Sequence, residues 1–147
     1  MRHSLTRVLP YTPAQLFTLV GDVEAYPDFV PWVTRLTTHN RADEGPGVVG
    51  FDAEAVVGFS IVHERFSTHV RLDAPSLLVD VQLLSGPFRR LTNRWSFAPD
   101  PDGAKLTFDI DFAFKSRLLE TLLAANFQRA VTRLVACFED RARVLYG

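Results

Sequence analysis

Cysteine and lysine are both scarce in this 147-residue sequence. The single cysteine, Cys137, excludes an internal disulfide and a cysteine-rich metal site and is typical of a reducing compartment. Only two of the 16 basic residues are lysine, so arginine carries almost all of the positive charge. Because the net charge is −1 and the pI about 6.4, no overall field attracts nucleic acid, and we expect no DNA partner.

Long apolar runs are absent as well. No stretch approaches the roughly 18 apolar residues of a membrane-spanning helix, and the first residues lack the apolar segment of a signal peptide. We therefore expect a cytoplasmic protein that contacts the inner membrane only transiently, as a peripheral protein. The sequence contains no repeat, low-complexity tract or linker, which predicts one domain over residues 1–147.

Apolar and aromatic residues are abundant. Hydrophobic residues make up 47% of the chain, and 12 of its 17 aromatic residues are phenylalanine, which adds bulk without a polar atom that needs a partner. A chain of this length buries roughly two thirds of the surface that it exposes when unfolded. Such a composition suits a folded domain with an apolar interior.

The N-terminal part of the chain is divided by helix-start and turn signals. We expect a strand at about residues 3–9, then a short helix over residues 14–20 that Thr12 caps and Pro13 begins. A second short turn is expected over residues 22–25. In residues 26–32 (YPDFVPW) two prolines disfavour helix for the residues before them, so we expect an irregular connection with exposed apolar tips.

From Val33 onward, apolar residues recur mostly at every second position, which is typical of strands. The turn signals EGPG, DAPS, SGP and PDPDG separate these strands, as in an antiparallel meander. The expected strands cover residues 33–41, 47–57, 59–72, 77–84, 88–98 and 105–114. In the last of them, the alternation LTFDIDFAF places large apolar side chains on one face and Asp109 and Asp111 on the other.

A long amphipathic helix is predicted at the C-terminal end. Ser116 is a cap residue, and the run that follows to about Tyr146 contains neither glycine nor proline. At ~1.5 Å per residue, such a helix is about 45 Å long. Its apolar stripe consists of Leu119, Leu122, Leu123, Phe127, Ala130, Val131, Leu134, Phe138 and Leu145. The fold class that follows is α+β, with a curved antiparallel sheet wrapped around a long C-terminal helix.

The apparent catalytic motifs lack the structural context that they need. Glycines at positions 45, 47 and 50 match a phosphate-binding pattern, but a strand pattern follows where a helix start is needed. His63 and Glu64 begin a zinc-binding motif whose second histidine position holds Ser67. Asp109 and Asp111 share the polar face of a strand, and each of the scattered histidines is interpreted as a satisfied surface residue. We therefore predict no catalytic residue and no metal site.

Several polar residues leave two interpretations open. The two-residue period carries three of them to the apolar face: Glu64, Thr68 and Asn93. These side chains either hydrogen-bond a ligand carbonyl or hydroxyl, or bind water at a cavity floor or rim. Three arginines lie close together in the strand at residues 88–98: Arg89, Arg90 and Arg94. They either contact phosphate, of RNA or of a lipid headgroup, or belong to a solvated strand face, which we favour.

Four segments carry a resemblance to a known family: residues 26–32 (YPDFVPW), the strand FSIVHERFSTHVRLD, the block LLSGPFRRLTNRWSF and the terminal RARVLYG. Over nearly its whole length the chain resembles the coenzyme Q-binding protein family, part of the START-like polyketide cyclase superfamily. The most specific elements are Tyr26-Pro27 with Pro31-Trp32, the Gly86-Pro87-Phe88 turn, and Trp95 followed by Phe97. Where the family often has a cysteine after the Pro-Trp pair, this chain has Val33, which favours a packing role there.

The resemblance implies a helix-grip fold with a cavity between the sheet and the C-terminal helix. Its members are thought to bind ubiquinone or a precursor and to support respiratory electron transport or quinone biosynthesis without catalysis. The implied cargo is thus ubiquinone or another isoprenoid lipid, with no cofactor. Closely similar sequences are ribosome association toxins, which regulate subunit joining through ribosome contact, and more distant ones are aromatic polyketide cyclases. The cyclase alternative is the weakest, because Glu64 is the only titratable group on the predicted inner face.

The residues expected to line the cavity face the interior from the strands and from the long helix. They are Glu64, Phe66, Thr68, Leu91, Asn93, Trp95, Phe108, Ile110, Phe112, Phe127, Val131 and Leu134. The residues expected to form the cavity mouth and to dock on the membrane are Tyr26, Phe29, Trp32, Pro87 and Phe88. The alternatives are an ordinary filled core for the lining and a capped core end for the mouth.

Overall fold

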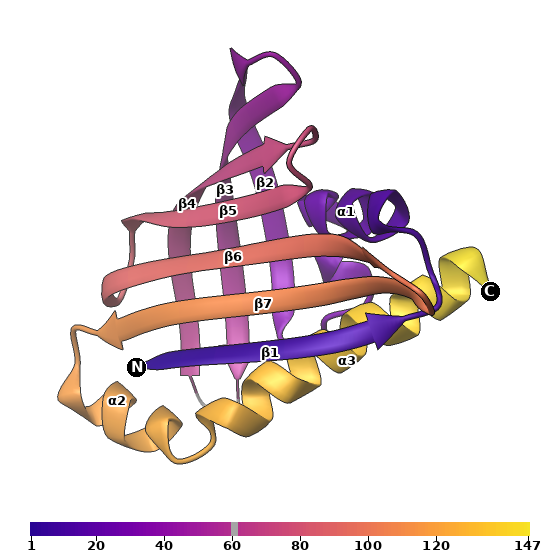
Figure 1. Cartoon of the computed structure of the whole chain (residues 1–147). Helices are drawn as coiled ribbons and strands as arrows, with labels where there is room; N and C mark the ends of the chain where they lie inside the picture. Colours follow the sequence, from indigo (N-terminus) through magenta and orange to yellow (C-terminus); the bar gives the residue numbers. More distant parts are fainter. Residues whose placement is uncertain (60–61) are drawn as a thin grey trace.

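The computed structural model describes residues 1–59 and 62–147. Its strands form one seven-stranded antiparallel sheet in the order β1-β7-β6-β5-β4-β3-β2. The strands are β1 (Arg2–Leu9), β2 (Val33–Gly45), β3 (Val48–Phe59), β4 (Val62–Asp73), β5 (Leu78–Ser85), β6 (Phe88–Asp100) and β7 (Gly103–Phe114). The predicted meander is confirmed, and its last strand, β7, pairs with β1 from the N-terminus (Figure 1).

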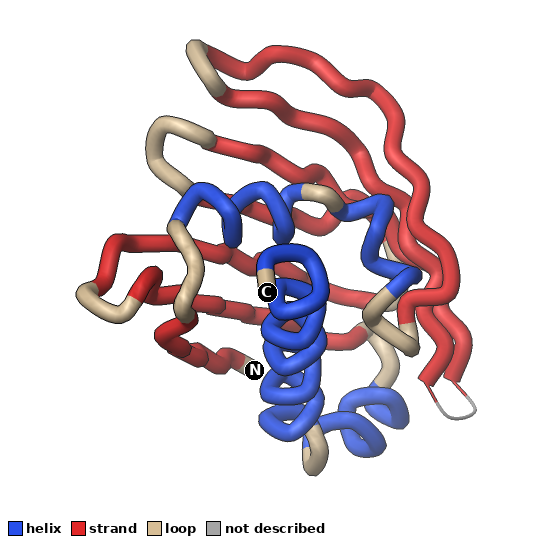
Figure 2. Tube along the Cα trace, turned by 90° about the vertical axis from the view of Figure 1, so that its right-hand side faces the viewer, coloured by secondary structure: helices blue, strands red, loops and turns tan. Residues whose placement is uncertain are grey.

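The sheet curves around the helices, which lie on its inner face. Helix α3 (Phe127–Tyr146) runs along this face, with α1 (Pro13–Gly21) and the 3-10 helix η1 (Val23–Asp28) on the same side. Figure 2 looks along α3 and shows the strands bent around it. The predicted α+β fold class, a curved antiparallel sheet around a C-terminal helix, is confirmed.

The first helix begins where the sequence predicts. Thr12 accepts a hydrogen bond from the Gln15 amide at 3.1 Å, and the Gln15 side chain accepts one from the Thr12 amide at 2.9 Å. This capping box, with Pro13 in the first turn, satisfies amides that a helix start leaves unpaired. The turn that follows is longer than expected, because η1 extends to Asp28 and includes Pro27.

The prediction of one C-terminal helix of about 45 Å is wrong. The segment forms two helices, α2 (Arg117–Ala124) and α3, which are separated at Ala125 and Asn126. Asn126 has a non-helical backbone, with φ −115° and ψ 10°. With 20 residues, α3 is about 30 Å long. The break lets α2 pack at the end of β7 while α3 takes another direction, which one straight helix would not allow.

Two leucines of the predicted apolar stripe do not face the sheet. Leu122 of α2 is 50% exposed, and Leu145 near the C-terminus is 49% exposed. The side chains of α3 that are buried at helical spacing are Val131, Val135, Phe138 and Ala142. Helix α3 therefore packs inward through one stripe, which Tyr146 continues at the end of the helix by packing against the main cluster.

The interior holds two apolar clusters. The main cluster lies between the sheet, α1 and α3, and Trp95, Phe108 and Phe138 are among its largest buried members. The second, which we name the α2 cluster, lies beneath α2, and its buried members are Leu91, Phe112 and Phe114. Both clusters use the face of β6 and β7 that the two-residue period predicts to be apolar.

Candidate functional site

The apolar residues predicted to line a cavity all lie in or against the two clusters. Those of the main cluster are Trp95, Phe108, Ile110, Phe127, Val131 and Leu134. Those of the α2 cluster are Phe66, Leu91, Ile110, Phe112 and Phe127. Because Ile110 and Phe127 lie against both, the two clusters form one continuous apolar interior between the sheet and the helices.

Close aromatic contacts occupy this interior. The ring centroid of Trp95 lies 4.3 Å from that of Phe108 and 4.8 Å from that of Phe138 on α3. The rings of Phe112 and Phe127 are 4.3 Å apart. These are the separations of packed aromatic pairs. A ligand can therefore enter at these positions only if the side chains move apart.

Asn93 is a polar residue on this apolar face. It lies between Leu91 and Trp95 in β6, opposite Val81 of β5 and Ile110 of β7. Its Oδ1 atom is buried and has no hydrogen-bond partner in the part of the chain that the structure describes. A buried polar atom without a partner costs stability, so most such atoms bond to protein, water or a ligand. Asn93 is thus well placed to hold a polar group inside the apolar interior.

The other two inward polar residues lie at different distances from Asn93. The strand register aligns Asn93 with Val70 two strands away, and buried Thr68 is the next inward position along β4. Glu64 is half-buried and pairs with Val57 of β3. It lies six residues from Val70, roughly 20 Å along an extended strand. The structure therefore brings Thr68 near Asn93 and leaves Glu64 at the far end of β4.

His3 is an inner-face residue that the sequence analysis missed. It is the register partner of Ile110, and its ring meets the ring of Phe127 edge-on, with centroids 6.1 Å apart. The signal was the two-residue period, because His3 has the same parity as Leu5 and Leu9 in the first strand. The expectations that every histidine lies on the surface and that Glu64 is the only inward titratable group are therefore wrong.

The first mouth segment is less exposed than its prolines suggest. Tyr26 and Phe29 both pack edge-on against Phe138 of α3, each at 5.1 Å between ring centroids. The Tyr26 hydroxyl donates a hydrogen bond to the Val20 carbonyl, and burial raises the pKa of this phenol. Trp32 is half-buried as well. Exposed apolar tips are thus a wrong expectation for this segment, because η1 and its C-cap residue place Tyr26 and Phe29 against α3.

The second mouth segment, the turn between β5 and β6, is also packed. Phe88 stacks on Phe114 at 4.9 Å between ring centroids and meets Phe66 edge-on at 5.3 Å. The Pro87 carbonyl accepts a hydrogen bond from the Lys115 amide at 2.8 Å, which ties the turn to the start of α2. An exposed tip is a wrong expectation for Phe88 too, because its ring lies against the α2 cluster.

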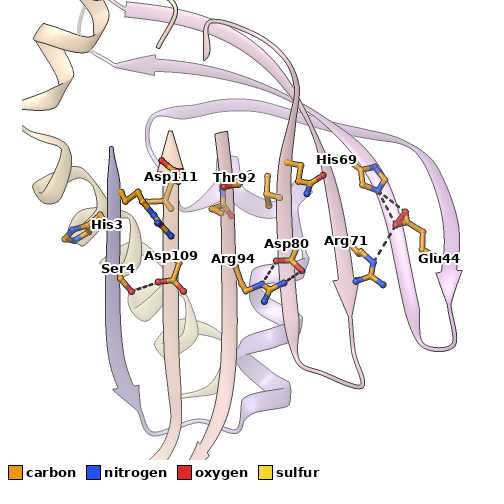
Figure 3. A pocket seen from close by; sticks show the side chains of 15 residues that line it. His3, Ser4, Glu44, His69, Arg71, Asp80, Thr92, Arg94, Asp109 and Asp111 are labelled. Carbon is orange, nitrogen blue, oxygen red and sulfur yellow. Dashed lines mark hydrogen bonds and ion pairs between the residues drawn. The ribbon is translucent and has the colours of Figure 1, made fainter. Parts of the chain in front are cut away.

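A polar groove of about 850 Å³ lies on the outer face of the sheet (Figure 3). Arg94 of β6 donates two hydrogen bonds to Asp80 of β5, at 2.6 and 3.1 Å. Arg90 donates to Asp111 of β7 at 3.2 Å. Cross-strand pairs of this kind stabilise a solvated sheet face. Because carboxylates neutralise both arginines, the structure favours the solvated interpretation over phosphate contact.

His69 lines the same groove beside Glu44 (Figure 3), and its ring lies between the carboxylates of Glu44 and Asp52. Its Nδ1 atom is 2.9 Å from Asp52, and its Nε2 atom is 2.8 Å from Glu44 of β2. The hydrogen bonds to Asp52 and then to Glu44 raise the pKa of the imidazole above its usual value. Glu44 approaches over Gly50, where an added Cβ would collide with the carboxylate. His69 is a satisfied surface residue that ties the β2–β3 hairpin to β4.

Groups suited to chemistry other than binding are few in the described residues. Cys137 on α3 is half-buried, and burial raises the pKa of its thiol, which disfavours a nucleophilic thiolate. Within residues 1–59 and 62–147, no three His, Cys, Asp or Glu side chains are arranged to hold a metal ion. None of the helices in these ranges is both long and apolar enough to span a bilayer.

The fold is that of the START superfamily. A START superfamily protein from Mycobacterium smegmatis matches with a TM-score of 0.82 over 98% of both chains, at 22% sequence identity. The solution structure of the 18 kDa protein CC1736 from Caulobacter crescentus matches with a TM-score of 0.84, over 100% of this chain and 99% of that chain, at 55% identity. The helix-grip architecture that the resemblance implies is confirmed.

The chain belongs to the polyketide cyclase/dehydrase and lipid transport family, whose model matches residues 9–139. The ribosome association toxin RatA of Rickettsia prowazekii (strain Madrid E) is 33% identical over 94% of this chain and 93% of its own length. The mitochondrial coenzyme Q-binding protein COQ10 of Drosophila melanogaster is 36% identical over 90% of this chain and 54% of its own length. Both resemblances that the sequence carries are therefore confirmed.

Proposed function

We propose that the protein binds a quinone-type isoprenoid lipid, ubiquinone or a precursor, and presents it for respiration or quinone biosynthesis without catalysing a reaction on it. The lipid is cargo rather than a cofactor. Lipid transport is part of the description of the matching family, and a relative is named as a coenzyme Q-binding protein; both support this proposal. So does the continuous apolar interior, because burying apolar ligand surface contributes about 25 cal/mol per Å².

The observation that carries the proposal is the unpaired amide oxygen of Asn93. A quinone ring is flat and largely apolar, and its ring oxygens are carbonyls in the quinone and hydroxyls in the quinol. An amide side chain suits both forms. Its Oδ1 atom accepts a hydrogen bond from a hydroxyl, and after rotation of the amide Nδ2 donates one to a carbonyl. We place the ring at Asn93, with Thr68 nearby.

The predicted lining and mouth keep their places in this proposal. The isoprenoid tail lies among the apolar side chains of the two clusters, which separate to admit it. One side of the mouth is the β5–β6 turn with Pro87 and Phe88. The other side is the segment at Trp32, whose carbonyl accepts a hydrogen bond from the Gly58 amide at 2.9 Å. Glu64 belongs to this side of the mouth, because its partner in β3 is Val57, the residue before Gly58.

The first test is extraction followed by substitution of Asn93. Organic extracts of freshly purified protein, analysed by mass spectrometry, should contain an isoprenoid quinone or related lipid at near-stoichiometric amounts. Asn93→Leu should weaken the binding of a short-chain quinol about five- to tenfold, since a neutral hydrogen bond contributes about 1 kcal/mol. The free energy of unfolding should stay equal or rise, because the substitution removes a buried unpaired oxygen.

Thr92→Val is the matched control, because Thr92 is exposed and lies beside Asn93 on the outer face of the same strand. We expect it to bind quinol like the unsubstituted protein. Unchanged quinol binding by Asn93→Leu would remove Asn93 from the site. Extracts without lipid from several preparations, together with no uptake of added quinone, would contradict the proposed function as a whole.

A ribosome-associated regulator of subunit joining is the second candidate function. It is favoured by the identity to RatA over nearly the full length of both chains. An aromatic polyketide cyclase is a weaker candidate, because such an enzyme needs a positioned acid or base. His3 and Glu64, the acid–base candidates on the inner face of the sheet, stand on β1 and β4, which three strands separate. At ~4.8 Å per strand, that is roughly 19 Å along the sheet.

A further inference from the structure

Helix α2 presents apolar side chains on two faces, about 100° apart around the helix axis. Leu119 and Leu123 pack against the α2 cluster. Leu118 and Leu122, one turn apart, are 68% and 50% exposed, and Ala125 after the helix is exposed too. Single exposed leucines are ordinary on a protein surface, but a contiguous apolar face marks an interaction site. The outward face of α2 is therefore a candidate docking surface.

Two exposed basic residues, Lys115 and Arg117, flank the start of α2. The basic residues between positions 115 and 138 are Lys115, Arg117, Arg129 and Arg133. The only acidic residue in that range is Glu120, whose carboxylate turns to the sheet and accepts a hydrogen bond from the Phe114 amide at 3.0 Å. The whole chain has a net charge of −1, so this segment differs in sign from the rest. Arg133 lies over the Trp32 ring, 5.6 Å from its centroid, so the cationic side chains next to α2 are Lys115 and Arg117.

We infer that the outward face of α2 docks on an anionic lipid bilayer. A short amphipathic helix binds a bilayer surface when its apolar side chains enter the headgroup boundary and basic residues attract anionic lipids. An RNA surface offers the same negative charge but no apolar medium for Leu118 and Leu122. The outward face of α2 also lacks an aromatic side chain on which bases would stack. The exposed Leu118 and Leu122 therefore favour a lipid bilayer over RNA as the partner of α2.

The position of α2 suits this role. Figure 1 shows α2 at the edge of the molecule, beyond the end of β7, where the sheet does not cover it. A hollow of about 270 Å³ lies beside the α2–α3 break and is lined by Met1, Arg2, Ala124, Ala125, Phe127 and Gln128. The inner face of α2 covers the α2 cluster. Docking therefore places α2, which closes this part of the apolar interior, at the bilayer surface.

The test is co-sedimentation of the full chain with vesicles, without added quinone, so its outcome is independent of the proposed ligand. The vesicles are phosphatidylcholine alone and phosphatidylcholine mixed with phosphatidylglycerol. We expect salt-sensitive binding to the mixed vesicles. The double substitution L118S/L122S should weaken this binding at least about tenfold, since two leucines no longer enter the boundary. L118S alone, at the more exposed position, should give an intermediate loss.

The matched control is V144S/L145S. These residues are 74% and 49% exposed near the end of α3, away from α2, so their substitution should leave vesicle binding unchanged. Equal vesicle binding by L118S/L122S and the unsubstituted protein overturns the inference, as does an equal loss in the control. Binding to ribosomal RNA in place of vesicles overturns it too. Quinone uptake from detergent by L118S/L122S should stay intact, which separates a docking failure from a ligand-binding failure.

Discussion

At the scale of single residues, three polar side chains differ in whether their nitrogen and oxygen atoms have partners. Asn93 holds an unpaired oxygen inside the apolar interior, where a ligand can use it. Arg141 of α3 has a buried Nε atom without a partner among the described residues, and its guanidinium lies over the Phe29 ring at 5.4 Å from the centroid. His69, on the outer face, is held by two carboxylates and is left with no group for a ligand.

The His69 contacts predict a pH dependence of stability. Because Asp52 and Glu44 raise the pKa of His69, their stabilisation is complete below the pKa of an unfolded histidine, about 6.5, and is lost as pH rises through the higher folded value. The thermal unfolding midpoint of His69→Gln should therefore lie furthest below that of the unsubstituted protein at mildly acidic pH. The difference should shrink in the alkaline range.

The pKa of Asp52 determines the pH below which the stabilisation by the His69 contacts is lost. Hydrogen bonds from Asn40 and then from His69 lower its pKa, so its contribution is present above the usual carboxyl pKa and is lost as pH falls through the lowered value. The difference in midpoint should therefore be largest between about pH 4.5 and 6. A difference that is constant from acidic to alkaline pH would show that the carboxylates do not act on His69.

At the scale of elements, turns and helix breaks decide which apolar side chains meet. The β5–β6 turn brings Phe88 back onto Phe66, and the break at Asn126 lets α2 cover a cluster that α3 contacts through its first residue, Phe127. Glu120 fixes α2 through its bond to the Phe114 amide. Both connections are short segments next to the proposed mouth, so we expect their geometry to control access to the interior.

The β5–β6 turn depends on glycine at position 86. Gly86 has φ +145°, and an added Cβ would stand 2.5 Å from the Cβ of Phe66. Gly86→Ala should therefore lower the free energy of unfolding by about 1–3 kcal/mol, as measured by urea denaturation. Ser85→Ala, at the exposed neighbouring position, should change it by less than about 0.5 kcal/mol. Equal effects of the two substitutions would mean that the turn tolerates a side chain.

At the scale of the whole molecule, the sheet separates two surfaces with different chemistry. Its inner face is apolar and is covered by α1, α2 and α3. Its outer face carries cross-strand ion pairs such as Arg94 with Asp80. A ligand of low polarity therefore suits the inner face, whereas a charged macromolecule would have to displace existing pairs on the outer one.

This separation predicts that the protein does not sediment with large ribosomal subunits at physiological ionic strength. Arg90 and Arg94 already pair with carboxylates, and Arg89 is exposed on the same strand. Co-sedimentation in a series of salt concentrations provides the measurement. Robust binding that falls with salt, and that charge reversal at the three arginines weakens with a smaller salt dependence, would favour the ribosome function instead.

The local patterns of the sequence determine most of the secondary structure. The Thr12 cap with Pro13 predicts the start of α1, and the alternation around Asp109 and Asp111 predicts which face of β7 is apolar. These features depend on residues next to one another in the chain. For the same reason, the period of two predicts correctly that Asn93 points inward.

Tertiary structure decides the rest. Asn126 ends a helix that its own sequence would continue, because the helices on either side pack on different apolar clusters. Tyr26 and Phe29 are turned inward because Phe138, more than a hundred residues later, offers them an apolar surface. His3 faces the interior because β1 pairs with β7 beside α3. The free energy of these contacts arises between segments distant in sequence, so local patterns do not encode it.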